Sequence, residues 1–265
     1  MILAKIPRSS YYYHLSKIDK LDKYNGIKSE IITIFNESKQ TYGYRRIECV
    51  LRQKGYIINH KTVNKLMKEL KLVVKVRKAK YKSYKGEVGK IAPNVLNRDF
   101  TATAPNQKWV TDVTEFAVCD EKIYLSPIMD LYNREIISYS ISKSPNFNQT
   151  REMLNDAFKY INELDKPILH SDQGWQYQMK TYQRLLEEHN IIQSMSRKGN
   201  CLDNACMENF FGRLKVEMFY GRTYTSVSNF IEELHNYIDY HNNKRISLKL
   251  KGMTPVQYRN HSTQI

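Results

Sequence analysis

The sequence has few cysteines and no long hydrophobic run, and both absences exclude classes of protein. No stretch of about 18 or more apolar residues occurs, which argues against a membrane-spanning helix. The amino-terminal residues lack the apolar core of a secretory signal, so we expect a cytoplasmic protein. Four cysteines have neither metal-ligand nor disulfide-framework spacing, and we expect them to be reduced packing residues: Cys49, Cys119, Cys201 and Cys206.

Acidic residues are scarce in the first 100 residues, which hold 8 Asp and Glu against 23 Lys and Arg, a balance of +15. Residues 101–265 hold 19 of each kind, so the net charge of +15 comes entirely from the first part. This asymmetry favours a polyanion-binding module joined to a neutral module. A well-solvated basic surface would explain the charge almost equally well.

Residues 1–72 are predicted to form a helical region with a helix-turn-helix. Apolar residues recur at helical spacing in three groups: Ile27, Ile31, Ile34 and Phe35; Ile47, Val50 and Leu51; Val63, Leu66, Met67 and Leu70. Gly55 suits the left-handed end of one helix, and Asn59 can cap the next. An ordinary helical hairpin with a lysine-rich face also fits, but the charge asymmetry favours DNA binding. The candidate DNA contacts here are Lys61, Asn64, Lys65, Lys68, Arg45 and Arg46.

Residues 73–104 are predicted to be a basic linker. Seven of the residues from 75 to 90 are Lys or Arg, and Tyr81 and Tyr84 lie among them. Basic side chains neutralise phosphates, and aromatic rings stack on unpaired bases. The segment fits a plain solvated linker as well, and we favour a linker that also contacts DNA.

The pattern changes to α/β at about residue 105. We predict an α/β core over 105–220, followed by a carboxyl-terminal helix and a polar tail over 221–265. The predicted strands are 107–118, 122–132, 134–142, 166–172 and 191–196, and the predicted helices include 148–163, 182–190 and 228–243. A further amphipathic helix carries an apolar stripe of Met207, Phe211, Leu214 and Met218.

Three carboxylates stand where a site could form. Asp112 falls inside a predicted strand, Asp172 ends another strand, and Glu208 lies near the start of a helix. Sites in α/β sheets gather at the carboxyl ends of parallel strands, and converging carboxylates suit Mg²⁺ or Mn²⁺. Two such ions about 3.5–4 Å apart support phosphoryl transfer. Glu208 could instead complement a helix dipole and Asp172 could be a turn residue, but Asp112 is unfavourable within a strand.

The surrounding sequence resembles a known family. "WVTDVTEF", "LHSDQGWQY" and "SRKGNCLDNACMENFFGRLKVE" resemble the catalytic core of insertion-sequence transposases of the IS-three family, specifically the product of the second reading frame (OrfB). The family signature is Asp, Asp, then Glu after 35 intervening residues, with Lys or Arg seven residues later. Here 35 residues separate Asp172 from Glu208, and Lys215 stands at the later position. Segments near both ends also resemble the family.

The resemblance implies an α/β fold of the RNase H-like type, a mixed sheet flanked by helices, as in retroviral integrases. It implies that Asp112, Asp172 and Glu208 hold two divalent metal ions, Mg²⁺ or Mn²⁺. Water would free a 3′-hydroxyl at the element's end, and that hydroxyl would attack a second phosphodiester. No zinc module of the integrase kind is expected, because its His and Cys spacing is missing.

The resemblance also implies roles around the three acids. Lys215 would contact DNA of the element's end, and Arg197 and Asn204 are weaker candidates for the same task. His170 and Gln173 flank Asp172 and are expected to support it.

The expected partners are double-stranded DNA, as terminal inverted repeats and target, and further copies of the chain assembled on DNA. The resemblance implies the product of the first reading frame as another partner, as a fusion or a separate chain. In the family that product supplies a leucine zipper, and this chain shows no sustained heptad repeat. The resemblance implies a bacterial protein associated with the nucleoid. Two alternatives stay open: a regulator that binds element ends without cutting them, and an RNase H-like nuclease that does not join ends.

Overall fold

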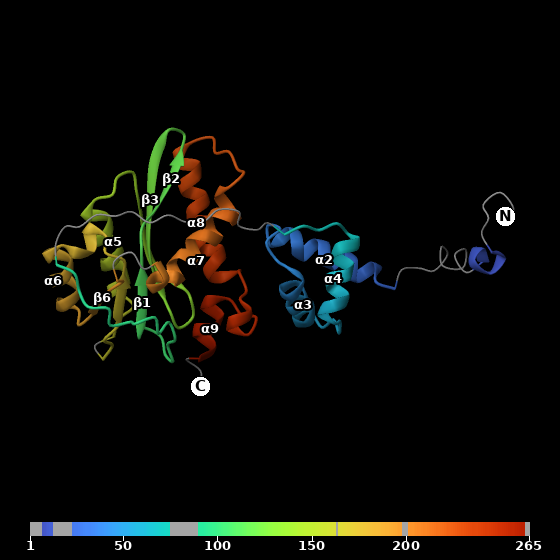
Figure 1. Cartoon of the computed structure of the whole chain (residues 1–265), viewed down its shortest axis with the longest axis horizontal. Coiled ribbons are helices and arrows are strands. Elements are labelled where there is room, and N and C mark those ends of the chain that lie inside the picture. The colour runs from blue at the N-terminus through green and yellow to red at the C-terminus, as the bar shows by residue number, and fades with distance from the viewer. Residues whose placement is uncertain (1–6, 13–22, 75–89, 163, 198–200, 263–265) are drawn as a thin grey trace. The chain divides into compact units, whose positions relative to one another are not determined.

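The computed structural model describes residues 7–12, 23–74, 90–162, 164–197 and 201–262 (Figure 1). The chain divides into two compact units, Met1–Val74 and Lys75–Ile265, and each is described by itself. Residues 75–89 of the predicted basic linker, with Tyr81 and Tyr84, lie outside the described residues. The division into four predicted segments stays a prediction.

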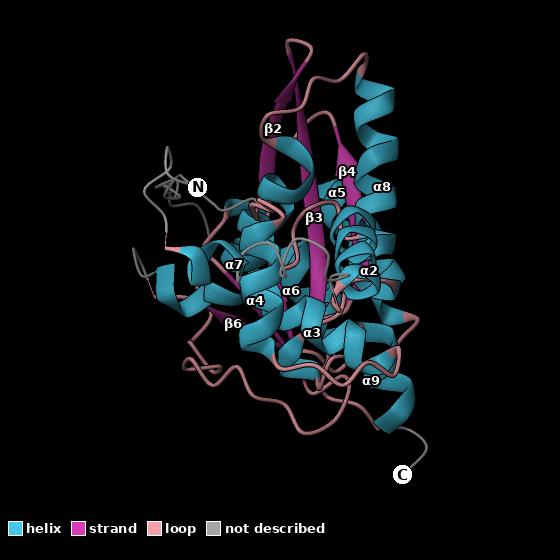
Figure 2. Cartoon of the chain, turned by 90° about the vertical axis from the view of Figure 1, so that its right-hand side faces the viewer, coloured by secondary structure: helices cyan, strands magenta, loops and turns pink. Residues whose placement is uncertain are grey.

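Between residues 23 and 74, the first unit consists of three packed helices. They are α2 (Asn25–Glu37), α3 (Tyr44–Gln53) and α4 (His60–Glu69) (Figure 2). Each helix contacts the other two. The buried side chains of the three helices all belong to the predicted stripes: Ile31, Ile34, Phe35, Ile47, Leu51, Val63, Leu66 and Met67. The helical region expected from apolar periodicity is therefore confirmed.

The turn between α3 and α4 forms as its residues predict. Gly55 has a φ of 88°, in the left-handed region that only glycine adopts without steric cost. The Asn59 side chain accepts a hydrogen bond from the Lys61 N–H at 2.8 Å and so caps α4. The helix-turn-helix geometry follows from these two positions.

The second unit is built on one mixed six-stranded sheet. Its strands are β1 (Lys108–Thr111), β2 (Thr114–Val118), β3 (Glu121–Asp130), β4 (Ile136–Ser142), β5 (Ile168–Ser171) and β6 (Ile192–Met195). β3 pairs antiparallel with β1, β2 and β4, whereas β1, β5 and β6 form a parallel run. The predicted α/β class is confirmed.

One predicted strand is interrupted at Asp112. The pattern over 107–118 predicted a single strand, but the structure has β1 and β2 with Asp112 and Val113 between them. β1 and β2 pair with β3 in the same register, as one continuous strand would. The strand is therefore interrupted at Asp112 and Val113 without a shift of register. The break lies opposite Pro127, whose carbonyl accepts a hydrogen bond from the Thr111 hydroxyl at 2.9 Å. Because proline has no N–H, the ladder loses a bond on that side.

Helices cover both faces of the sheet. α5 (Phe147–Phe158) and α6 (Lys180–Glu188) lie on one face, and α7 (Ala205–Leu214) and α8 (Val227–Asn243) lie on the other (Figure 1). α5 ends at Phe158, five residues before the predicted end at 163. The sheet is thus the middle layer of three.

The predicted polar tail contains a helix, α9 (Pro255–Ser262). Its start is a reciprocal cap: the Thr254 N–H donates to Gln257 Oε1 at 3.0 Å, and the Gln257 N–H donates to Thr254 Oγ1 at 3.2 Å. Pro255 suits the first helical position. Arg259 then pairs with the buried Asp130 at 2.8 Å and fixes the helix to the sheet. The sequence analysis indicated only a polar tail and did not predict this helix.

Candidate active site

The sheet brings Asp112 and Asp172 to the same edge. β1 and β5 are parallel neighbours, with Val110 opposite His170. Asp112 and Asp172 each follow directly after the last residue of their strand. Each lies two residues beyond Val110 and His170 respectively, so the two acids are at equivalent positions. Neighbouring strands are about 4.8 Å apart, so the two carboxylates start from adjacent backbone positions. The strands that lead to the two acids are therefore neighbours in the sheet.

The surroundings of Asp112 disfavour its negative charge. Burial raises the pKa of Asp112 well above its ordinary value, and the charges of Asp172 and Glu208 raise it further. The Val113 N–H, which donates to Asp112 Oδ1 at 2.8 Å, and the Lys215 ammonium act in the opposite direction. Burial also raises the pKa of Asp172. Carboxylates in such surroundings are stabilised by a nearby cation.

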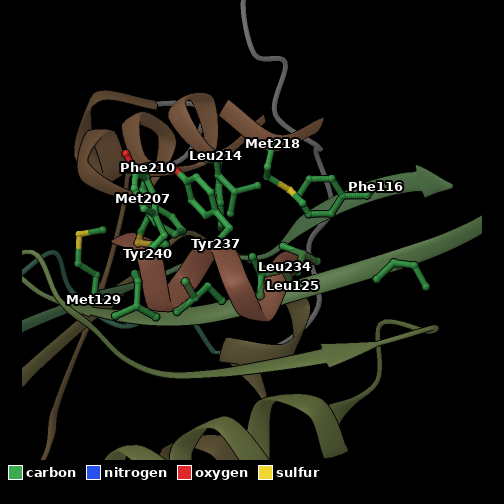
Figure 3. Close-up of a cluster of buried hydrophobic side chains, with 14 of the residues drawn as sticks. Phe116, Leu125, Met129, Met207, Phe210, Leu214, Met218, Leu234, Tyr237 and Tyr240 are labelled. Carbon is green, nitrogen blue, oxygen red and sulfur yellow. The ribbon is translucent and has the colours of Figure 1, made fainter. Parts of the chain in front are cut away.

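Helix α7 carries Glu208 to this edge. Its buried side chains include Met207, Phe210 and Leu214, which pack with residues of α8 and the strands (Figure 3). Just before the helix, the Asn204 amide donates to the Thr111 carbonyl at 3.1 Å, beside Asp112. The predicted apolar stripe is therefore the surface that anchors α7 to the sheet.

Lys215 stands where α7 gives way to a wider turn, η4 (Lys215–Phe219), of π-helical geometry. Its Nζ donates to the Glu115 carbonyl at 3.2 Å and lies 5.1 Å from the centre of the Phe116 ring. Lys215 and Glu208 act on Asp112 in opposite directions: the charge of Lys215 lowers the pKa of Asp112, and the charge of Glu208 raises it. Wide turns of this kind occur often at functional sites.

The donor chemistry of the three acids suits a hard cation. Carboxylate oxygens are the ligands that Mg²⁺ and Mn²⁺ prefer. Within the described ranges, however, no three side chains of His, Cys, Asp or Glu lie close enough together to hold a metal ion. Asp112, Asp172 and Glu208 thus interact electrostatically without forming a closed set of ligands.

Hydrogen bonds brace the chain on both sides of Asp172. His170 is fully buried, and its Nδ1 lies 2.8 Å from Ser194 Oγ. Burial lowers the pKa of His170 to about 4, so its ring is neutral at neutral pH. The Gln173 amide donates to the Ser196 carbonyl at 3.0 Å. Both side chains therefore tie β5 to β6.

Comparisons with known proteins agree with this architecture. Residues 102–201 and 208–263 each match a family described as "Integrase core domain", and residues 23–80 match one described as "HTH-like domain". InsK, from insertion sequence element IS150 of Escherichia coli K12, is 55% identical over 257 residues, which are 97% of this chain and 91% of that protein. "Transposase InsF for insertion sequence IS3A" of the same strain is 34% identical, over 97% of this chain and 92% of that protein. The chain belongs to the IS-three family of insertion-sequence transposases. A solved structure of the HTLV-2 integrase catalytic core in complex with magnesium is 18% identical in sequence. The match covers 60% of this chain and 99% of the integrase chain, with a TM-score of 0.44.

This IS-three transposase is thus an enzyme with an integrase-type catalytic core and a DNA-binding helix-turn-helix unit. The predicted DNA contacts of the helix-turn-helix unit differ in their exposure to solvent. Lys61, Lys65 and Lys68 are exposed on α4, and Asn64 is half-buried beside them. Arg45 is exposed at the start of α3.

Arg46 is less exposed than the neighbouring Arg45. It is half-buried, and its guanidinium lies 5.4 Å from the centre of the Tyr42 ring. Its side chain therefore packs along the unit's own surface.

The two predicted DNA contacts near the acids, Asn204 and Arg197, differ in how exposed they are. Asn204 of the transposase is buried and turns its amide to the Thr111 carbonyl, so it positions α7 rather than facing solvent. Arg197 has a side chain that is 54% exposed and lies 3.4 Å from Asp203. Residues 198–200, between Arg197 and Asp203, lie outside the described residues.

Sequence reasoning missed several buried polar residues of the transposase. Asp203 is fully buried and accepts hydrogen bonds from three directions. Glu217 in η4 pairs with Arg245 at 2.7 Å, and the side chains of both are 6% exposed. The only sequence cue for Asp203 was its place just before a helix that carries a candidate acid. No helix in the described ranges has the length and hydrophobicity to cross a bilayer.

Proposed function

We propose that this transposase cleaves and joins DNA at the ends of an insertion sequence, with Asp112, Asp172 and Glu208 as its catalytic acids. The observation that carries the proposal is the adjacency of Asp112 and Asp172 at the ends of two paired parallel strands. The interaction of Glu208 with Asp112 supports the third assignment. A regulator that only binds DNA would give no reason for a buried carboxylate beside two others.

The same three residues would hold divalent metal ions, Mg²⁺ or Mn²⁺ and two in number by family resemblance. Their oxygen donors and the raised pKa of Asp112 support this assignment. When bound, such ions stabilise charge on the attacked phosphodiester and activate the attacking oxygen.

The chain's own residues would orient the acids and the DNA. The Val113 N–H and the Gly174 N–H each hold a carboxylate oxygen, on Asp112 and Asp172 respectively, at 2.8 Å. Lys215 would contact DNA of the element's end, consistent with its place beside Asp112.

The helix-turn-helix unit would bind DNA outside the catalytic site. The exposed lysines of α4 support contacts with phosphates and bases in a groove. The terminal inverted repeats and the target are the proposed DNA partners. Further copies of the chain and the first-frame product are the proposed protein partners, since joining needs two ends together.

Strand cleavage of labelled element-end DNA with Mg²⁺ or Mn²⁺ tests the proposal. Glu208→Gln should reduce cleavage by about a hundredfold or more, because it removes a charged group that acts at the reacting centre. Glu232→Gln, at an exposed acid on α8, is the matched control and should leave cleavage unchanged.

Cleavage that survives Glu208→Gln would remove that residue from the mechanism. Binding of element ends without any cleavage by the intact chain would favour the regulator. Cleavage without joined or integrated product would favour the simple nuclease.

A further inference from the structure

A single buried carboxylate, Asp203, organises the chain beside the proposed catalytic acids. Its Oδ1 accepts a hydrogen bond from Arg98 Nε at 2.7 Å. Its Oδ2 accepts from the Asn94 amide at 3.1 Å and from the Arg197 backbone N–H at 3.0 Å. The Arg197 side chain also reaches it, with Nε 3.4 Å from Oδ2. Two arginines therefore converge on one acid with no exposed surface.

The two arginines carry more charge than the acid neutralises. Two guanidinium groups against one carboxylate leave a net charge of +1. The side chains of Arg98 and Arg197 are 42% and 54% exposed, so this charge faces solvent. Asp203 engages both through Nε, whereas a guanidinium has five N–H donors in a planar fork. One terminal nitrogen of Arg197 is held by Asn97 Oδ1 at 2.9 Å.

Of the two arginines, Arg197 is linked to Asp172 through the backbone. The Ser196 N–H donates to the Ser171 carbonyl at 2.9 Å, and the Ser196 carbonyl accepts from the Gln173 amide at 3.0 Å. Ser196 is thus bonded to the residues on both sides of Asp172. Arg197 follows Ser196 in the chain, so the backbone of Arg197 lies at the edge of the proposed site.

The backbone at Arg98 is held in a conformation that side chains disfavour. Asn97 and Arg98 have φ values of 44° and 65°, in the left-handed region. The N–H groups of Val95 and Leu96 donate to Ser194 Oγ at 2.9 and 3.1 Å and fix this turn to β6. Such strain persists where the surrounding structure imposes it, and it is common at functional sites.

We propose that Arg98 and Arg197, held by Asp203, form a binding site for a DNA backbone phosphate beside the catalytic acids. Guanidinium groups match phosphate oxygens in two-pronged geometry, and fixing them beforehand reduces the entropy lost on binding. This inference rests on the proposed function, because it supplies a DNA contact to the same site. A purely structural role for the ion pairs predicts no contribution to DNA binding.

The salt dependence of DNA binding separates the two roles. The intact chain is titrated onto a duplex that carries the end sequence of its own element, in EDTA, over a series of salt concentrations. Arg197→Ala leaves Asp203 paired with Arg98 and should reduce the slope of log K against log salt by about 0.9, the value for one lost phosphate contact. Arg98→Gln should do the same, and the double variant should lose about twice as much.

Arg184→Ala is the matched control, because Arg184 is an arginine on α6 with a side chain that is 71% exposed and a glutamate partner. It should keep the wild-type slope. Thermal unfolding of each variant shows which ones are folded. One folded single variant, at Arg98 or at Arg197, is enough to test the phosphate site. Wild-type slopes in the folded Arg98 and Arg197 variants would overturn the proposal.

Cleavage by the wild-type chain with Mg²⁺ is measured in parallel. Cleavage together with unchanged slopes would refute the phosphate site and leave the proposed function standing. Reduced slopes without any wild-type cleavage would support the phosphate site and refute the proposed function.

Discussion

Replacing Asp112 by Asn should stabilise the protein when no divalent cation is present. Equivalent positions on neighbouring strands are about 5 Å apart. At an effective dielectric constant of about 20, two like charges at that distance repel each other by about 3 kcal/mol. Asp172 is only half-buried, so solvent screens part of this repulsion, and we expect a gain of about 1–2 kcal/mol in the free energy of unfolding. Asn keeps an oxygen that can accept from the Val113 N–H.

The gain should shrink as the solution is acidified. The folded state holds the pKa of Asp112 above its ordinary value of 3.8, so the folded protein takes up this proton at a higher pH than the unfolded chain. The wild-type protein therefore gains stability as the pH falls through the folded pKa toward 3.8. Asp112→Asn has no such gain, so the two stabilities should converge at acid pH.

Urea denaturation in EDTA, and again with Mg²⁺, measures these effects. In EDTA the midpoint of Asp112→Asn should exceed that of the wild type. Mg²⁺ at a hundred times its Kd should stabilise the wild type by about 2.7 kcal/mol and the variant by less, because the variant has lost one proposed ligand. Asp156→Asn removes an acid with a side chain that is 57% exposed, and it should retain the wild-type response to Mg²⁺. An Asp112→Asn midpoint below that of the wild type in EDTA would refute the repulsion on which the reasoning depends.

Two further substitutions test the packing around the site. Glu217→Gln should cost about 3–5 kcal/mol in urea denaturation, because it leaves the buried Arg245 without its charged partner, and adding Arg245→Met should restore much of the loss. Burial raises the pKa of Glu217, but the hydrogen bonds and charge of Arg245 outweigh it and hold the pKa below 4.5. The pair's contribution is thus present above pH 4.5 and lost as the pH falls through the folded pKa, and Glu217→Gln should lack this acid-range dependence. Gly174→Ala should lower cleavage while the protein stays folded, because the added Cβ would lie 2.9 Å from Asp172 Oδ1 and 2.7 Å from the Gln176 side chain. Unchanged cleavage by Gly174→Ala would show that the Asp172 carboxylate tolerates displacement.

Local sequence determined the helical unit and the outline of the core. Apolar spacing selected the buried faces of α2, α3 and α4, because a helix places residues three and four apart on one side. Gly55 and Asn59 fixed the turn, since backbone conformation and capping depend on neighbours within a few residues. The spacing from Asp172 to Glu208 marked the candidate acids through its resemblance to the family signature.

Only the tertiary structure decided the features that join distant parts of the chain. Pro127 on β3 interrupts the strand at Asp112, and no pattern around Asp112 contains that information. Arg98 and Asp203 are 105 residues apart, and Glu217 and Arg245 are 28 apart. A buried charge is stable only where the fold brings it a partner. Sequence periodicity encodes which face of an element is apolar, whereas the partners of its charges are set by how the elements pack.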